Sequence, residues 1–334
     1  MASINKTKML LTGAALLLDM SAQTAMAADI NVTRCVGSLT KTLSGQSVTF
    51  WGFGTGGMMC TGTVPGAAIE VGVYPAGSTT TDTLNLTLNM AMAPQEAAPY
   101  NGHTIHMHGA DVKTSEDGVP ETGAAVNGDT YTWTPTPDMA GSYPYHCHVH
   151  TVKHLEMGMY GAIIVRPKSA AGAWLNQITH NTATAFDYVQ NYVLSTVDPA
   201  YHTATGDSTV FADYNPAYFL INGNQGLTTA APASTLTTAI NKKVALRLIG
   251  MHSTNGTFTI KDAGGAAKNF TIHTQDGRAL ATPQTVSSVD IAPGQRFDIL
   301  FTTPTTTGTW YPQMTYKKLR DNAAYATVYG KVTF

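Results

Sequence analysis

Seven of the chain's 11 histidines lie in two short segments, residues 102–109 and 145–159, and the second segment also holds a cysteine. The first segment has the pattern HxxHxHG, and the second contains HCH. Imidazole and thiolate groups at this density suit copper, and two histidines, one cysteine and a weakly bound methionine form the ligand set of a blue, one-electron centre. The fold must therefore bring two distant segments to one place.

Strand geometry predicts how these side chains are sorted, because successive residues of a strand point to opposite faces. If the two segments are neighbouring strands, His103 and Cys147 fall on one face. The opposite face then receives the two histidines of each HxH or HCH pair, which are His106, His108, His146 and His148. The sequence thus predicts two metal sites back to back.

The site that contains Cys147 needs a second imidazole and an axial ligand. We expect His154 and Met159, which follow the strand, to supply them, so the predicted type 1 copper ligands are His103, Cys147, His154 and Met159. His150 is the alternative to His154. The second site has four imidazoles and no thiolate, which suits a copper that binds oxygen or another small oxidant. Imidazole alone also suits zinc, but the neighbouring thiolate site favours copper.

Short runs rich in Thr, Val, Ile and Tyr alternate with Gly, Pro, Asn and Asp along the chain, as at residues 83–88. This pattern predicts an all-β protein of many short antiparallel strands, arranged as two sandwiches in tandem. One helical turn or two is expected at 170–177. We expect the following organisation: a signal peptide at 1–27, a copper-binding domain at 28–168, a connection at 169–189, and a second domain at 190–334 without copper motifs.

The N-terminus is typical of a secretory signal, because two lysines precede an apolar stretch at 9–18 and an Ala-Met-Ala cleavage site at 25–27. That stretch is too short to span a bilayer and no later apolar segment is long enough, so we expect a periplasmic or secreted protein without a membrane span. A formal net charge of -2 without basic runs excludes nucleic acid as a partner.

Two further cysteines, Cys35 and Cys60, lie near the mature N-terminus. In an oxidising compartment we expect a disulfide between them, and two buried free thiols are the alternative. The histidines outside the two segments are scattered, and for each a structural role is favoured: His180, His202, His252 and His273.

The two histidine segments resemble those of the multicopper oxidases, with the copper nitrite reductases as close relatives. HxxHxHG at 103–109 and HCH at 146–148 are similar to the copper segments of a laccase-type oxidase. The run 154–167 is similar to the nitrite reductase segment in which His and Met five residues apart complete the blue site, and the region 219–298 resembles an oxidase domain. The resemblance implies two tandem cupredoxin-like Greek-key β-sandwich domains. It also implies type 1 copper at the first site and type 2/type 3 copper at the second.

The second domain departs from this family pattern. It has no HxH pair, its residues 310–315 read WYPQMT where an HCH would stand, and no histidine lies near Thr315, where the nitrite reductases complete their type 2 site. Cys147 and His154 are seven residues apart, whereas five is usual in the oxidases. A complete cluster would then require the first domains of two subunits to face each other, so a homo-oligomer is expected.

The resemblance implies a copper oxidoreductase that takes single electrons from a small reducing substrate or an electron-donor protein and passes them to O2 or another small oxidant. The alternative is a type 1 copper electron carrier or copper-handling protein without turnover. A scaffold that has lost its metal is a third hypothesis, which an intact Cys147 with its flanking histidines disfavours.

Overall fold

The structure is a computed structural model that describes residues 27–334 except 57, 58, 79, 92, 97, 99, 126, 127 and 204–213. The expected signal peptide falls, apart from its last residue, outside the described residues. Within the described part of the chain, no helix is both long enough and apolar enough to cross a membrane.

The first half of the chain forms a β-sandwich. Its outer sheet has the order β2 (Gln46–Gly54), β1 (Asp29–Leu43), β4 (Thr83–Asn89) and β6 (Thr130–Trp133). Its inner sheet has the order β3 (Gly66–Val73), β8 (Tyr160–Pro167), β7 (Gly141–His146) and β5 (His106–Met107). Most of the strand pairs in this sandwich are antiparallel, as expected, while the pairs β1–β4 and β3–β8 are parallel.

The second half forms another sandwich. One sheet has the order β10 (Tyr218–Ile221), β9 (Tyr188–Val197), β12 (Lys243–Gly250), β18 (Arg296–Thr302), β15 (Phe270–Gln275) and β16 (Arg278–Val286). The other has the order β11 (Ser234–Thr237), β20 (Ala324–Thr333), β19 (Thr309–Lys317), β13 (Asn255–Asp262) and β14 (Ala267–Lys268), and β17 (Ser288–Ile291) also pairs with β13. The predicted all-β, cupredoxin-like architecture is confirmed.

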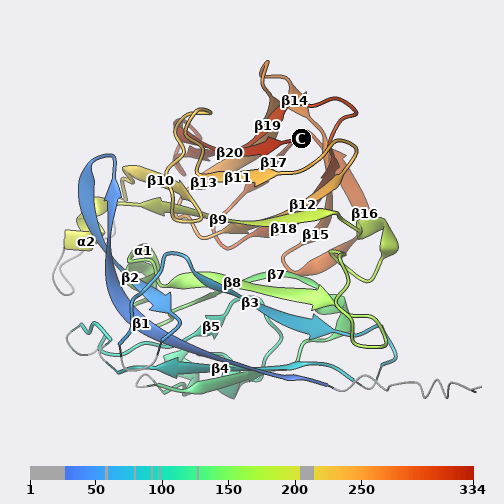
Figure 1. Ribbon diagram of the computed structural model, residues 1–334. Helices are drawn as coiled ribbons and strands as arrows, with labels where there is room; N and C mark the ends of the chain where they lie inside the picture. The colour runs from blue at the N-terminus through green and yellow to red at the C-terminus, as the bar shows by residue number, and fades with distance from the viewer. Residues whose placement is uncertain are drawn as a thin grey trace, which may run out of the picture.

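The four sheets stack in layers, with β7 and β8 in the middle of the molecule (Figure 1). The outer strand β4 buries only alternate residues, Leu84, Leu86 and Leu88, as a strand with one solvated face does. All six residues of β7 are buried, because the core of the first sandwich covers one face and the second sandwich covers the other. The strand that leads into HCH is therefore enclosed on both faces.

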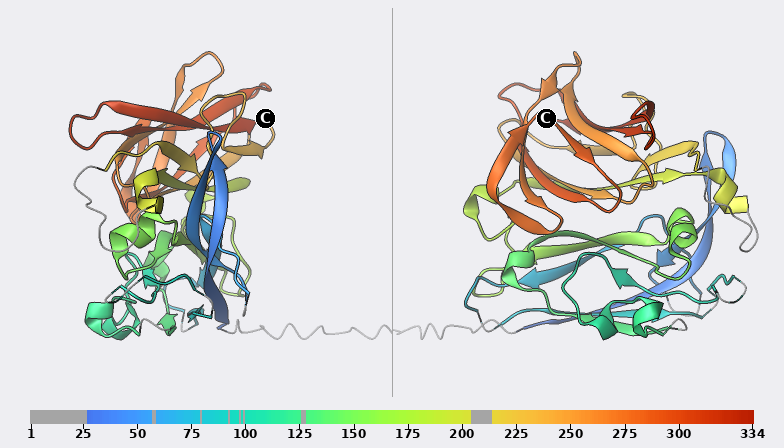
Figure 2. Two further views of the ribbon diagram at one scale, coloured as in Figure 1. Left: turned by 90° about the vertical axis from the view of Figure 1, so that its left-hand side faces the viewer. Right: turned by 180° about the vertical axis from the view of Figure 1, so that it is seen from behind.

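Polar and apolar contacts join the two sandwiches. The carboxylate of Asp298 on β18 accepts hydrogen bonds from Ser142 on β7 at 2.5 Å and from Thr274 at 2.7 Å, and Arg247 lies 3.2 Å from it. The long β1–β2 hairpin runs up to the second sandwich (Figure 2), where the backbone N–H of Ser44 donates to a side chain of that domain. These contacts fix β7 against the second sandwich.

The helical turn expected at 170–177 is absent, so that prediction was wrong. The segment turns at Gly172, which has a φ of +85°, and forms a bridge from Lys168 to Trp174. The Lys168 ammonium lies 4.5 Å from the Trp174 ring centroid, a cation–π contact that favours the compact turn. The helices described are α1 (Thr151–Glu156) and α2 (Pro199–Thr203), with 3-10 turns at η1 (Thr114–Glu116), η2 (Pro120–Thr122), η3 (Pro137–Met139) and η4 (Thr182–Thr184).

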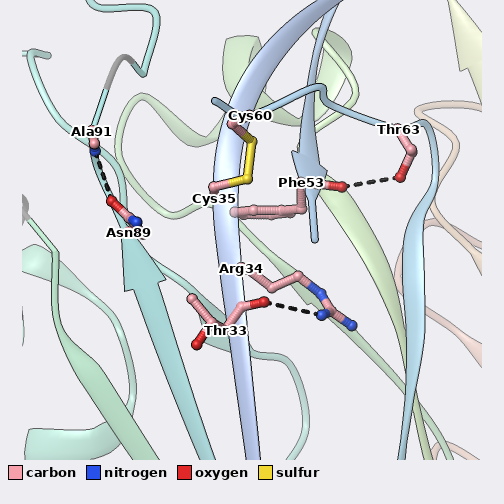
Figure 3. Close-up of a disulfide and its surroundings, with 8 residues drawn as sticks. All are labelled: Thr33, Arg34, Cys35, Phe53, Cys60, Thr63, Asn89 and Ala91. Atoms are coloured by element: carbon pink, nitrogen blue, oxygen red, sulfur yellow. Dashed lines mark hydrogen bonds between the residues drawn. A yellow bond between two sulfur atoms is a disulfide. The ribbon is translucent and has the colours of Figure 1, made fainter. Parts of the chain in front are cut away.

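The predicted disulfide is confirmed. Cys35 on β1 is bonded to Cys60 in the segment that follows β2, as Figure 3 shows. Cys147 is the free cysteine, and it is buried. The disulfide therefore leaves one thiol for the histidine segments.

Candidate metal centre

The two histidine segments are neighbouring strands. β5 pairs antiparallel with β7, and the register places His106 opposite His146 and Met107 opposite Tyr145. Directly opposite residues in a sheet share a face. The pairing therefore brings His106 and His146 together on one side of the sheet.

The first site consists of His103, Cys147 and His154, all fully buried, whose ligand atoms lie within 4.8 Å of one another. Cys147 Sγ is 3.1 Å from His154 Nδ1 and 3.8 Å from His103 Nδ1. His103 Nε2 is 2.6 Å from the carbonyl of Pro94, and because a carbonyl only accepts, this nitrogen carries the hydrogen. The lone pair of His103 is thus left on Nδ1, which faces the sulfur.

The loop between Cys147 and Met159 accommodates the seven-residue spacing through a short helix. Helix α1 turns His154 toward Cys147, and the Cys147 N–H donates to the Met159 carbonyl at 3.1 Å. The Met159 N–H in turn donates to the His154 carbonyl, and its side chain belongs to the same apolar cluster as Cys147. His150 has a φ of +42° and stacks on Tyr100. The structure therefore brings His154, and not the alternative His150, against the thiol.

The electrostatics of the first site favour a thiolate. Burial raises the pKa of Cys147, but His154 and His103 outweigh burial and lower that pKa to about 5. Burial lowers the pKa of His154, but Cys147 and Glu96 outweigh it and raise that pKa to about 9. The thiolate is the form of cysteine that binds metals. A buried thiolate and two imidazoles fit copper by the chemistry of their donors.

Glu96 is a part of this site that the sequence analysis missed. Its Oε2 lies 2.6 Å from His150 Nδ1 and 3.4 Å from His154 Nε2, and its Oε1 forms an ion pair with Lys153. Burial raises the pKa of Glu96, but the His154, Lys153 and His150 contacts outweigh burial and hold it well below its usual range. The ionised carboxylate therefore lies on the side of the His154 ring that faces away from Cys147.

The second site is on the opposite face and contains the other four predicted histidines. Ligand atoms of His106, His108 and His146 lie within 4.8 Å of one another. The His148 ring centroid is 5.2 Å from that of His106, and His148 Nδ1 is buried without a hydrogen-bond partner among the described residues. The structure therefore gathers all four rings, with His148 outside the most compact group of three.

Hydrogen bonds to backbone carbonyls orient two of these rings. His106 Nδ1 is 2.7 Å from the carbonyl of Asp117, and His146 Nδ1 is 2.9 Å from the carbonyl of Cys147. Both Nδ1 atoms therefore carry hydrogens, and both Nε2 atoms keep lone pairs, an arrangement found in most metal-binding histidines. The Asp117 contact is made by a backbone carbonyl, so the identity of the side chain gives no signal for it in the sequence.

Two imidazoles of the second site, those of His108 and His146, are neutral at neutral pH in the metal-free protein. Burial lowers the pKa of His146 to about 3, against an opposing hydrogen bond to the Cys147 carbonyl. Burial, with Arg296 and His106, lowers the pKa of His108 to about 4. Neutral imidazole is the form that binds metal, so these residues fit a copper ion.

A cavity of about 220 Å³ adjoins the second site between the two sandwiches. The first sandwich contributes His108 and His146 and helix α1 contributes Leu155 and Glu156, while the second sandwich contributes Gly250, Met251, His252, Ser253, Pro293 and Gly294. The turn that contains Gly294 approaches His108 so closely that a Cβ on Gly294 would lie 3.3 Å from His108 Nε2. The second domain, which has no HxH pair, therefore still forms part of the surroundings of this site.

The sheets and the two donor clusters are thus those of a copper-binding protein with two cupredoxin-like sandwiches. Models of the multicopper oxidase family match residues 89–170 and 181–331, which together make up more than half of the chain. The chain belongs to the multicopper oxidase superfamily, whose members are copper-dependent oxidoreductases. No curated protein matches it by sequence.

Solved structures of similar fold include several oxidases. Fet3p, a multicopper oxidase that functions in iron import, has a TM-score of 0.65 at 17% identity over 90% of this chain and 52% of Fet3p. The blue copper oxidase from Nitrosomonas europaea has a TM-score of 0.62 at 21% identity over 91% of this chain and 86% of its own. The multicopper oxidase mgLAC has a TM-score of 0.65 at 20% identity over 92% of this chain and 86% of its own. At these identities the similarity shows the fold, and the chain spans about half the length of Fet3p.

Proposed function

We propose that this protein transfers single electrons from a reducing substrate, through a type 1 copper, to O2 or another small oxidant at a histidine-bound copper. The observation that carries the proposal is the position of Cys147. Its side chain faces His103 and His154, while its chain neighbours His146 and His148 belong to the cluster on the opposite face. The backbone thus provides a short covalent route from one site to the other.

Copper, when bound, would supply one-electron redox chemistry at the first site and oxidant binding at the second. The residues that would hold copper at the first site are His103, Cys147, His154 and Met159, and those that would hold it at the second are His106, His108, His146 and His148. The protein holds the first set in a buried, rigid arrangement, closed on one side by the Trp51 ring, whose edge meets His154. Rigid ligands limit the reorganisation that electron transfer requires.

The cavity beside the second site supports a small oxidant, because its volume of about 220 Å³ leaves little room for a larger substrate beside His108 and His146. The reductant, a small molecule or an electron-donor protein, would transfer its electron near the first site. Export to the periplasm or exterior accords with the disulfide between Cys35 and Cys60.

A homo-oligomer remains part of the proposal. His106 and His148 are partly exposed, so the first domain of a second subunit could approach these two rings. His108 and His146 border the second domain of the same chain and are less available for such a contact. A monomeric protein that still consumes oxygen with turnover would contradict the proposed homo-oligomer.

The alternative function is a type 1 copper electron carrier, favoured by the lack of HxH pairs in the second domain. Copper content and oxygen uptake of the purified protein discriminate between the two. Two or more coppers per chain with oxygen uptake support the oxidase. One copper with a blue absorption band and no uptake supports the carrier.

His106→Ala tests the assignment of the second site. We expect the blue band to persist and oxygen uptake to fall by about a hundredfold or more, because loss of a ligand has at least the effect of losing a supporting hydrogen bond. His180→Ala, outside both clusters, is the matched control and should leave uptake unchanged. Bleaching by His106→Ala would contradict the division of the histidines between two faces.

A further inference from the structure

His252 lies in the loop between β12 and β13 of the second domain, far from both histidine segments in the sequence. The sequence analysis assigned it a structural role. In the structure its side chain is 2% exposed and lines the same cavity as His108 and His146, from the opposite sandwich. It is therefore the histidine of the second domain that borders the second site.

The hydrogen bonds of His252 define its tautomer. Nδ1 is 2.8 Å from the carbonyl of Thr254, so Nδ1 carries the hydrogen and Nε2 keeps a lone pair. Nε2 is buried and has no hydrogen-bond partner among the described residues. A buried polar atom without a partner destabilises the folded state, so a ligand that binds this lone pair would remove a penalty already present in the fold.

A similar arrangement occurs at His106 and His146, where Nδ1 meets a backbone carbonyl and Nε2 keeps its lone pair, which at His146 faces His108 Nδ1 at 3.3 Å. The other histidines after residue 168 differ. His180 uses Nε2 for the carbonyl of Lys168. His202 has the same hydrogen-bond arrangement as His252, with Nδ1 on the Thr49 carbonyl, but its Nε2 lies 3.9 Å from a Glu156 carboxylate oxygen and it does not line the cavity. Among the second domain's histidines, His252 is the one that shares both the orientation and the cavity of the predicted ligands.

The surrounding residues hold the His252 ring in place. Tyr316 packs edge to face with it at a centroid distance of 5.5 Å, and the Tyr316 hydroxyl donates to the carbonyl of Leu220. The next residue, Ser253, donates its backbone N–H to Thr196 Oγ1 at 3.1 Å. Burial lowers the pKa of His252 to about 4, so the ring is neutral at neutral pH. The ring is thus fixed in the form that binds metal.

We propose that His252 is a further imidazole ligand of the second copper site, contributed by the second domain across the cavity. The inference rests on the proposed function, because it requires that this site hold copper. His252 is not a member of the compact group formed by His106, His108 and His146. Because it lines the cavity together with His108 and His146, it would approach a bound copper from the cavity side. A single imidazole would then replace the HxH pairs that this domain lacks.

The test compares His252→Gln with His273→Gln, a matched variant of a buried histidine in the same domain that does not line the cavity. Copper affinity at the second site is measured by competition with a chelator, and the blue band reports the first site and the fold. We expect His252→Gln to bind the second-site copper at least about tenfold more weakly, with the blue band intact. His273→Gln should match the wild type.

A second measurement does not depend on the variant's folding. In wild-type protein labelled with ¹⁵N-histidine, loading with Cu(I) should shift the resonances of His252 and of the six histidines predicted from the sequence. Shifts confined to those six overturn the inference, as does an unchanged affinity in His252→Gln while the wild type binds second-site copper. A wild type that binds only the blue copper overturns the proposed function as well.

Discussion

The two donor clusters lie on opposite faces of one strand, yet they differ in almost every physical property. The cluster of His103, Cys147 and His154 is fully buried, charged and presents Nδ1 atoms to the sulfur. The cluster around His106 and His146 is partly exposed and opens into a cavity, and these two rings keep their lone pairs on Nε2. Burial lowers the pKa of its members His108 and His146. A site that only exchanges electrons needs no access for a ligand, whereas a site that binds an oxidant does. The contrast therefore supports a division of labour.

Replacing the sulfur should have the largest effect. Cys147→Ser leaves His103 and His154 without a thiolate, so we expect complete loss of the blue absorption band and of electron entry. Visible absorption and copper content per chain measure this directly. The histidine-only cluster should keep its copper. A variant that stays blue would show that the thiolate is not a ligand.

Acid should destabilise the metal-free protein through the buried histidines at and beside the second cluster. The folded-state pKa of His252 is about 4, below the 6.5 of an unperturbed histidine, so the unfolded state binds protons first as the pH falls. The stability that His252 contributes is complete above pH 6.5 and is lost between there and pH 4, about 3 kcal/mol from a shift of this size. The pKa values of His146 and His108 are also lowered in the folded protein, so these residues likewise contribute stability that is lost as the pH falls.

Chemical denaturation of the metal-free protein at pH 7, 5.5 and 4 measures this loss. His252→Gln is the control, because it lacks one of the groups that titrate, and its stability should fall less steeply with acid. Equal slopes for the wild type and the variant would mean that His252 is protonated alike in the folded and unfolded states.

The disulfide should matter for stability and not for colour. Cys35 and Cys60 are separated by 25 residues in the sequence. Removing such a disulfide gives the unfolded chain more conformational freedom and lowers the free energy of unfolding by about 2–4 kcal/mol. The double variant Cys35→Ser/Cys60→Ser should unfold at lower denaturant concentration with an unchanged blue band. Bleaching in this variant would show that the link also shapes the first cluster.

The division of the histidines between two faces could be predicted from the sequence because strand parity is a local property. The pairing of β5 with β7 covers His106 and His146, whereas His108, Cys147 and His148 lie just beyond the paired residues, so their positions also depend on the adjoining loops. The helical turn at 170–177 was wrong because Gly172 and the Lys168–Trp174 contact favour a compact turn over a helix.

The residues that the sequence did not reveal come from distant segments. His252 reaches the cavity only because β12 lies against β7, and Glu96 reaches His154 only through the path of the loop before β5. Neither residue belongs to a repeated spacing that could mark it. The positions of these two residues are determined by packing in the folded protein, which a pattern of residues in the sequence does not show.

The smallest expected effect concerns the side of the first cluster that faces away from the sulfur. The Glu96 carboxylate lies 3.4 Å from His154 Nε2, where its negative charge favours the more positive oxidation state of a bound copper. Glu96→Gln removes the charge and keeps the shape, so we expect the reduction potential of the blue site to rise. A tenfold change in the relative affinity for the two oxidation states corresponds to about 60 mV for one electron.

Redox titration of the blue band measures this shift, and Glu121→Gln, which changes an exposed acid in η2, is the control for a general loss of negative charge. An unchanged potential in Glu96→Gln would mean that Lys153, which pairs with Glu96, already cancels its field at the copper. The charges around the first cluster would then not affect the reduction potential of its copper. Of the two clusters, the second, which opens into the cavity, would be the one whose metal is influenced by neighbouring residues.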